Sequence, residues 1–436
     1  MHRSLWAVLA GTFSLRFSTG LTGAMLATYL AHLADHGGPT VDPIVVGLFS
    51  ALFYLAELIL SPVFGILSDR QGHHRVMLYG PIFGAVAVIM TGFTADLGLP
   101  APLALLLAPI TGSLVVLGVT RLLEGASTAA SIPSILGFIA TATAGDELLR
   151  GKASARFEGA TLLGIGAGFA LAPVAFALLG PTAFFLNAIL YAGSFVIFWT
   201  VKPPAVDPAA AAQPPHIGFG RYVELLGSSH VWLLAPTWIA VNASIGLWFS
   251  QSIFQFAKEN PDFPTQSLMR GFSAVQISGA AVVIGIIFGL GLLYWGNRFK
   301  NTRRTTIILY GILGGGGLVA AGLVLNHGLG LPLLVVVVAS AVAAFGLFVL
   351  AGATPAALGL LADISERFPH DRGAIMGLYS VFLAIGQIAG ALIGGFAATA
   401  VGIDGMLVAT AVLLVIALLP LARLRGAEDP VTGMIG

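Results

Sequence analysis

Long hydrophobic segments recur along the whole chain. A helix needs about 20 mostly apolar residues to cross roughly 30 Å of hydrocarbon, where it must satisfy its own backbone hydrogen bonds. The pattern predicts twelve such spans, at residues 5–33, 43–67, 76–95, 112–140, 155–180, 183–201, 230–257, 272–296, 305–326, 332–361, 373–400 and 405–422. Prolines at 100, 102 and 109 interrupt the apolar run 97–112, which predicts a long outer connection or a short half-helix there. The sequence therefore predicts an all-α integral membrane protein.

The composition excludes an ordinary soluble enzyme. Of the 436 residues, 57% are apolar and only 9% are charged, against about a quarter charged in soluble domains. The chain has no cysteine, which excludes disulfides and thiolate metal sites, and its net charge of +1 gives no indication of nucleic-acid binding. We find no enzyme motif, and we expect no cofactor, no metal site and no catalytic residue.

Basic residues predict the orientation in the membrane. Assigning the loops alternately to the two sides places sixteen Lys and Arg residues on one side, whereas only Lys258 and Arg270 fall on the other. By the positive-inside rule, both termini are then cytoplasmic. We expect a multi-pass protein of a bacterial inner membrane.

The spans form two groups of six. A polar, proline-rich stretch at 202–229 predicts a cytoplasmic linker with a short interfacial helix, between an N-terminal bundle (1–201) and a C-terminal bundle (230–436). An offset of 222 residues pairs Gly164 with Gly386 and Gly168 with Gly390, and an offset of 231 pairs the Leu-Tyr-Gly triplets at 78–80 and 309–311. Duplicated, pseudo-symmetric six-helix halves are typical of alternating-access carriers.

The loop between spans two and three carries a recognisable motif. It reads Gly65-Ile-Leu-Ser-Asp69-Arg70-Gln-Gly72-His-His-Arg75, and it resembles the signature loop of the major facilitator superfamily. Span four adds Arg121-Leu-Leu-Glu124-Gly125, which resembles the second motif of that family. The resemblance covers essentially the whole chain and implies a secondary transporter with twelve helices in two bundles, similar to the drug exporters of the family.

This loop is a candidate conformational latch. The small Gly65 and Gly72 let helix ends turn and approach closely, Asp69 can accept from N–H groups at a helix start, and Arg70 and Arg75 can hold further partners. Such a latch favours one of two states. The alternative is a basic signal that only sets topology, and the two histidines at 73 and 74 read as ordinary basic residues.

Four ionisable residues lie at membrane depth: Arg16, Glu57, Arg121 and Glu124. An unpaired charge there costs at least about 2.5 kcal/mol, so these residues should pair and face a cavity. We expect Glu57 or Glu124 to bind a proton beside an Arg. The alternatives are structural: Arg121 and Glu124, three residues apart, neutralise each other, and Arg16 pairs with Glu57 or contacts an anionic substrate group.

The second half offers uncharged polar groups for substrate binding. The candidates are Asn242, Trp248, Gln251, Gln255, Gln276 and Gln387. Aromatic rings with a few amides suit an amphipathic or lipophilic solute, although aromatic packing against lipid or other helices explains any one of them equally well. Span five resembles the glycine-rich span of the family's antiporters, but Phe169 stands where a proline is expected after Gly168.

These features predict a proton-coupled exporter of a small amphipathic or lipophilic compound. One alternative is uptake or facilitated diffusion of a small organic anion bound by Arg16, and another is lipid or lysolipid transport without proton coupling. The expected partners are a small-molecule substrate, protons and membrane lipids, with no nucleic acid, and the expected state is a monomer.

Overall fold

The computed structural model describes residues 3–97, 100–143, 146–202, 231–298, 302–366 and 372–427. The predicted interfacial helix of the linker lies outside these residues. The chain divides into two compact units, Met1–Pro214 with Phe272–Val282, and Pro215–Gly271 with Val283–Gly436. Each unit is described by itself.

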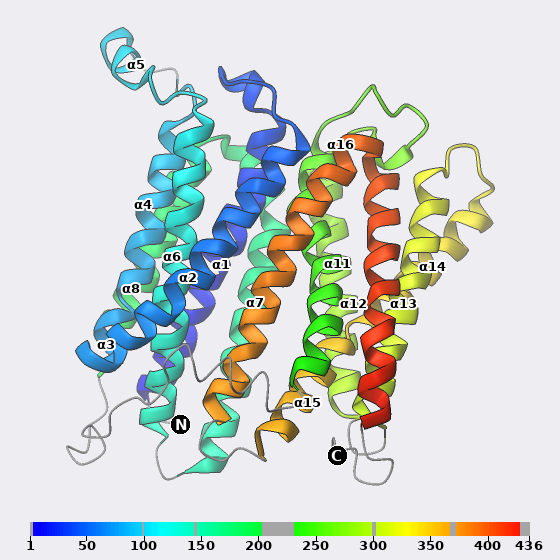
Figure 1. Cartoon of the computed structure of the whole chain (residues 1–436). Helices are drawn as coiled ribbons and strands as arrows, with labels where there is room; N and C mark the ends of the chain where they lie inside the picture. The colour runs from blue at the N-terminus through cyan, green and yellow to red at the C-terminus, as the bar shows by residue number, and fades with distance from the viewer. Residues whose placement is uncertain are drawn as a thin grey trace. The chain divides into compact units, whose positions relative to one another are not determined.

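The described residues form helices throughout and no strand (Figure 1). Up to residue 202 they form α1 (Arg3–Ala31), η1 (Leu33–His36), α2 (Pro43–Gln71), α3 (His73–Val76), α4 (Tyr79–Phe93), α5 (Ala101–Leu107), α6 (Leu114–Ala142), α7 (Glu147–Leu179) and α8 (Thr182–Trp199). From residue 231 they form α11 (Val231–Ala257), η2 (Ser267–Met269), α12 (Ala274–Gly296), α13 (Arg304–Asn326), α14 (Leu333–Leu350), α15 (Ala353–Glu366) and α16 (Arg372–Ala427).

The all-α membrane fold predicted from the sequence is confirmed. Within the described ranges, ten helical stretches are long and apolar enough to cross a membrane. One of them, Ser380–Gly426, contains the break of α16 at Val401 and Gly402, where Gly402 has a φ of 64°, so that two helices meet there. α1 has 29 residues, enough to span, and is more polar because it contains Arg16.

Two details refine the predicted spans. The short α5 occupies the proline-rich stretch at 97–112, in agreement with the predicted half-helix. The tenth predicted span, 332–361, is two helices, α14 and α15, because the chain turns at Ala351 and Gly352. Polar caps fix three of the other starts: Asp42, Ser113 and Asp146 accept from backbone N–H groups in the first turns of α2, α6 and α7.

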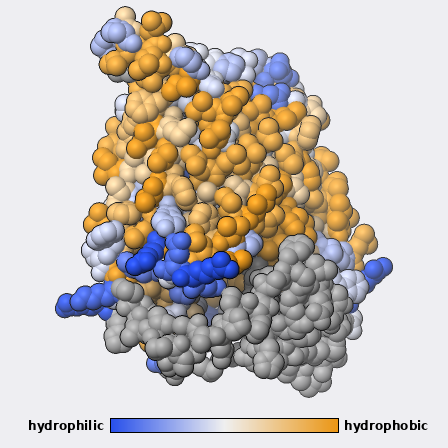
Figure 2. Space-filling model, turned by 60° about the vertical axis from the view of Figure 1, so that its left-hand side comes forward, coloured by the Kyte–Doolittle hydropathy of each residue, from blue (hydrophilic) through white to orange (hydrophobic). Residues whose placement is uncertain are grey.

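In the first unit, α1 packs along α7 and α8, whereas α6 packs against α2 and α4. α4 also contacts α8, so that these six helices form one bundle in which they run side by side (Figure 1). The surface of the molecule is hydrophobic across the middle of the displayed face, with hydrophilic residues gathered toward its ends (Figure 2). Such a surface suits contact with lipid rather than water.

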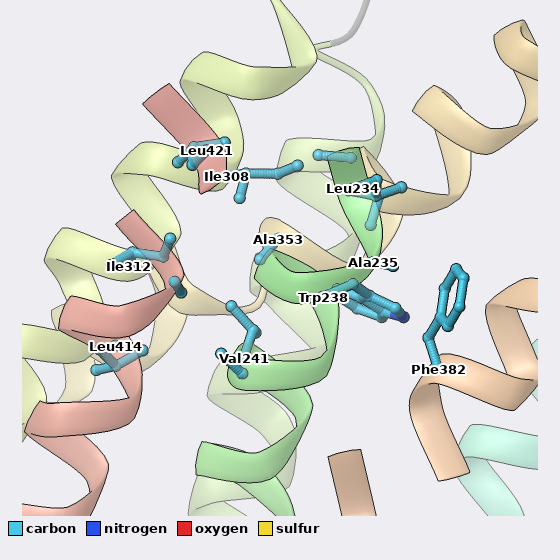
Figure 3. Packing of buried hydrophobic residues seen from close by; sticks show 14 of the residues in the cluster. Leu234, Ala235, Trp238, Val241, Ile308, Ile312, Ala353, Phe382, Leu414 and Leu421 are labelled. Atoms are coloured by element: carbon cyan, nitrogen blue, oxygen red, sulfur yellow. The ribbon is translucent and has the colours of Figure 1, made fainter. Parts of the chain in front are cut away.

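In the second unit, the core lies between α11, α13 and α16. Trp238 of α11 is 1% exposed and points toward Phe382 of α16 (Figure 3). Ile308 of α13 lies near Leu421 of α16, and Ile312 lies near Leu414 (Figure 3). The core of this unit is therefore built from apolar aliphatic and aromatic side chains.

The repeated glycines make equivalent contacts in both units. Gly164 of α7 lies directly against Arg16 of α1. Gly386 of α16, 222 residues later, lies directly against Asn242 of α11, which follows Arg16 by 226 residues. Asn242 therefore occupies in the second unit the position that Arg16 occupies in the first.

Candidate functional site

The charged residues of the first unit form a buried cluster. Arg16 comes from α1, Glu57 from α2, and Arg121 and Glu124 from α6. Arg16, Arg121 and Glu124 are 5%, 7% and 1% exposed, and Glu57 is half-buried. Four ionisable groups from three helices therefore lie together inside one unit, where an unpaired charge is costly to bury.

The tightest contact of the cluster lies within α6. Arg121 Nη1 donates to Glu124 Oε2, one turn further along the helix. The Arg121 guanidinium also lies over the ring of Phe53 on α2, 5.0 Å from its centroid. This local pair matches the structural alternative that the sequence left open, and its contact with Phe53 ties α6 to α2.

Glu124 is only half satisfied by this pair. Its second oxygen, Oε1, is buried and has no hydrogen-bond partner among the described residues. The Thr22 side chain of α1 interacts with the Glu124 carboxyl group, and Tyr191 of α8 lies near enough to interact with it electrostatically. Asn187 of α8 donates to the Thr22 hydroxyl at 2.7 Å, which fixes these side chains around the carboxyl group.

Arg16 connects α1 to the other helices. Its Nη1 donates to Thr128 Oγ1 of α6 at 3.3 Å, and Thr128 shares a face of α6 with Glu124 because they are four residues apart. Arg16 also interacts electrostatically with Glu57 of α2 and with Glu158 of α7. Arg16 thus links α1 to the neighbouring helices, and the hydrogen bond found for it among the described residues goes to a hydroxyl group.

Sequence reasoning missed Glu158. It stood three residues inside the fifth predicted span, where it served only to mark the border of an uncharged stretch. The structure starts α7 at Glu147, so Glu158 lies well inside a continuous helix. The position of Glu158 inside the predicted span, rather than at its edge, is the sequence signal that points to this residue.

The substrate candidates of the second unit follow the packing line of α11 and α16. Asn242 lies against Gly386, the Gln387 side chain lies against Gly246, and Gln251 lies against Gly394.

Most of these candidates are buried. Gln251, Gln255 and Gln387 are 0%, 4% and 7% exposed, and the buried Gln255 Nε2 and Gln387 Oε1 have no hydrogen-bond partner within the described ranges. The Trp248 indole donates to the Thr410 hydroxyl at 2.9 Å, which leaves the faces of the ring for apolar contacts.

Gln276 stands apart from the other candidates. It is exposed, and its Oε1 accepts from the backbone N–H of Ser273 at 2.9 Å and from its hydroxyl at 3.0 Å. These bonds cap the start of α12, so the structure gives Gln276 a helix-capping role.

The candidate latch is built around Gly72. This residue has a φ of 93°, ends α2 and begins α3, and Gly65 packs near Pro133 of α6. Asp69, Arg70 and Arg75 are exposed.

The two histidines of this loop have specific contacts that the sequence did not predict. The His73 ring lies against Gly137 of α6, with Nδ1 3.2 Å from the Ser68 hydroxyl and Nε2 4.0 Å from the Asp69 carboxylate. His74 Nε2 lies 3.0 Å from the backbone oxygen of Phe198, in α8. The loop is therefore held to two helices of its unit.

The arrangement defines a class of protein. No group of three His, Cys, Asp or Glu side chains able to hold a metal ion occurs in the described part of the chain. A hydrophobic helical protein with equivalent packing in two units and with an ionic cluster buried in one of them is a membrane transporter rather than an enzyme.

Comparison with known proteins identifies the family. The family model described as Major Facilitator Superfamily matches residues 8–363. The chain therefore belongs to the Major Facilitator Superfamily and is a secondary transporter. No curated protein sequence matches it.

Several solved transporter structures share the fold. The nucleoside transporter NupG superposes with a TM-score of 0.66 at 14% identity, covering 97% of this chain and 98% of its own. A bacterial homologue of the human lysosomal transporter Spinster, in an inward-facing and unoccupied conformation, gives 0.65 at 13% identity, covering 97% and 96%. An auto-inhibited peptide transporter of the POT family gives 0.63 at 14% identity, covering 97% of both chains. At these identities the likeness concerns the fold alone.

Proposed function

We propose that the protein is a proton-coupled exporter of a small amphipathic or lipophilic compound. The observation that carries this proposal is the Glu124 carboxyl group. One of its oxygens accepts from Arg121, and the other is buried with no hydrogen-bond partner in the part of the chain that the structure describes. An unsatisfied buried acceptor costs about 1–3 kcal/mol. A proton on Oε1 would turn this oxygen into a hydrogen-bond donor and remove the negative charge of Glu124. The attraction between Glu124 and the Arg121 guanidinium would then be weaker, so proton binding competes with the ion pair.

This opposition can drive a conformational change. A ligand shifts two states only as far as its affinity differs between them. The Arg121 guanidinium already lies over Phe53 of α2, so loss of its bond to Glu124 would alter the contact between α6 and α2. Glu57 acts on the same cluster through Arg16.

The substrate class follows from the second unit. Buried amide atoms of Gln255 and Gln387 lack partners in the described residues, and the ring of Trp248 is fixed by its bond to Thr410. A few polar atoms among aromatic and aliphatic side chains suit a solute with a large apolar part. The transporters of similar structure include a nucleoside transporter and a peptide transporter, so the fold alone does not determine the substrate.

The proposal includes the cellular setting. Both termini and the Gly65–Arg75 loop would face the cytoplasm of a bacterial inner membrane, since the basic residues gather on that side. There the loop, through Asp69 and the two arginines Arg70 and Arg75, would act as the conformational latch. The protein would work as a monomer, because each unit already contains its own candidate residues.

Two measurements test the function. A thermal-shift screen over cationic dyes, sugars, organic anions and lysolipids identifies the class that stabilises the purified protein, with about 2.7 kcal/mol expected at 100-fold excess over Kd. In proteoliposomes with an imposed pH gradient, the stabilising compound, for example ethidium, should then dissipate the gradient.

Substitutions identify the coupling group. Glu124→Gln should abolish coupled proton movement, whereas Asp262→Asn, which alters an exposed carboxylate in the loop after α11, should leave it unchanged. Normal coupling in Glu124→Gln would refute the mechanism. Stabilisation by lysolipid without proton movement would favour lipid transport.

A second candidate function rests on Arg16. Its guanidinium is buried, and the hydrogen bond found for it in the described residues goes to the neutral Thr128, so further donors can meet an anion. In that case benzoate should stabilise the protein, and Arg16→Glu should abolish this effect. Transport of ethidium that survives Arg16→Glu would exclude this candidate.

A further inference from the structure

Glu158 of α7 has no part in the proposed function as argued so far. The membrane-crossing stretch of α7 begins at Lys152, which places Glu158 about 9 Å along the helix. Its side chain is exposed, and Arg16 is the charged group that acts on it electrostatically. A carboxylate at this depth needs a partner or a function.

The packing of α1 on α7 brings Arg16 to this region. Gly164 lies against the Arg16 Cβ, and Gly168 lies against Phe17 and Leu21, so the two helices run in the same direction with fixed register. A long side chain in a helix points back toward the helix N-terminus. Arg16, whose Cβ lies against Gly164, thereby comes within electrostatic reach of Glu158, six residues earlier on α7.

A second polar group of α7 lies between Glu158 and Gly164. Thr161 is 9% exposed, and its hydroxyl has no hydrogen-bond partner among the described residues. It lies one turn before Gly164, on the buried stripe of α7 that faces α1, and three residues after Glu158. An unsatisfied hydroxyl inside a membrane bundle is costly, so Thr161 adds a buried polar group to the stretch of α7 between Glu158 and Gly164.

Arg16 thus interacts electrostatically with two carboxylates on different helices. Glu57 belongs to α2, which packs on α6, whereas Glu158 belongs to α7, which packs on α1. The remaining titratable groups around the cluster are Tyr54 of α2, Arg121 and Glu124 of α6, and Tyr191 of α8. Arg156, two residues before Glu158, has its guanidinium over the Trp6 ring of α1, 4.9 Å from its centroid.

Glu158 changes the charge of the cluster. Arg16 and Arg121 against Glu57 and Glu124 cancel, whereas the addition of Glu158 leaves the fully ionised cluster at a net charge of −1. One proton makes it neutral.

We propose that Glu158 and Glu57 share Arg16 as their cationic partner. The additional negative charge of Glu158 then gives the cluster the capacity to bind one proton. The partnership of Glu158 with Arg16 does not depend on the proposed function. The capacity of the cluster for one proton rests on the proposed function. With Arg16 held between Glu57 and Glu158, and Arg121 held by Glu124, the proton is bound at the free oxygen of Glu124.

A double-mutant cycle tests the partnership without any substrate. Glu57→Gln and Glu158→Gln should each leave Arg16 one carboxylate, so each should lower the unfolding temperature only slightly. The double variant leaves a buried cation without a carboxylate and should lose roughly 6 °C or more beyond the sum of the two single changes.

Two further variants make the cycle decisive. Adding Arg16→Gln to the double variant removes the unpaired charge and should restore most of the lost stability, and Glu158→Asp should behave as the wild type. Additive single effects, or a double variant no weaker than Glu57→Gln alone, would overturn the partnership.

Infrared titration of the reconstituted protein tests the proton capacity. The wild type should show one protonated carboxyl band that Glu124→Gln removes, and Glu158→Gln should weaken this band at the same pH because the cluster is then already neutral. An unchanged band in Glu158→Gln would refute this capacity.

The experiments separate this inference from the proposed function. If Glu124→Gln abolishes proton flux while Glu158→Gln changes neither the infrared band nor the double-mutant cycle, the proposed function stands and this inference fails. If the double-mutant cycle is non-additive but Glu124→Gln still couples transport to proton movement, the partnership of Glu158 with Arg16 stands and the proposed function fails.

Discussion

The contact of α7 with α1 depends on a glycine that can be tested directly. A Cβ at Gly168 would collide with the backbone oxygen of Phe17 and lie 2.6 Å from the backbone nitrogen of Leu21. Backbone atoms cannot rotate away, so the helices must separate, and overpacking of this kind costs about 1–3 kcal/mol. Alanine regains about 0.5–1 kcal/mol of helix preference, which leaves a net loss of about 1–2 kcal/mol for Gly168→Ala.

A glycine two residues away supplies the matched control. A Cβ at Gly166 would meet nothing within 4 Å, so Gly166→Ala should be neutral or stabilising by up to about 1 kcal/mol. Thermal unfolding in detergent, followed by tryptophan fluorescence, should separate the two variants by roughly 4–8 °C. Gly390→Ala, whose Cβ would collide with Ala243 of α11, should repeat the loss in the second unit. Equal unfolding temperatures for Gly168→Ala and Gly166→Ala would refute the packing argument.

Three further predictions concern other parts of the chain. Arg121→Gln leaves Glu124 buried without its cation and should lower the free energy of unfolding by about 3–5 kcal/mol, whereas the double change with Glu124→Gln should recover most of it, as measured by thermal unfolding. Asn326 is fully buried and donates to Asp404 at 2.9 Å, so Asn326→Leu should cost about 2 kcal/mol and speed proteolysis of the loop before α12. Gly72→Ala should cost about 1–2 kcal/mol, because the φ of 93° is unfavourable for alanine; an unfolding temperature equal to that of the wild type would contradict this.

The helices were predictable because their signal is local. Hydrophobic length placed the spans within a few residues, and spacing along one helix predicted the contact of Arg121 with Glu124. The break between α14 and α15 was not predictable, because both flanks of Gly352 are apolar and the turn depends on packing: a Cβ at this glycine would collide with Trp295.

Contacts between helices required the structure. Arg16 and Thr128 are 112 residues apart, and no pattern along the chain sets the register of α1 against α6. The sequence likewise does not show that Glu158 interacts with Arg16, because this interaction depends on where α1 places Arg16. Gln276 caps α12 together with Ser273, three residues earlier, a local pattern that the sequence already contains, and its role in substrate binding stays a prediction.

The two units show that one packing scheme can hold different chemistry. Gly164 against Arg16 and Gly386 against Asn242 are the same helix contact, so the backbone does not dictate that a charge occupies this position. Arg16 persists in a place where an amide fits equally well, although a charge there costs several times more than an amide to bury. Under the proposed function this cost has a use: the first unit handles the proton, and the second keeps neutral amides and rings for the solute. Coupling between proton and solute then depends on the two units moving together, so a substitution in the ionic cluster should change transport without touching any residue that binds the cargo.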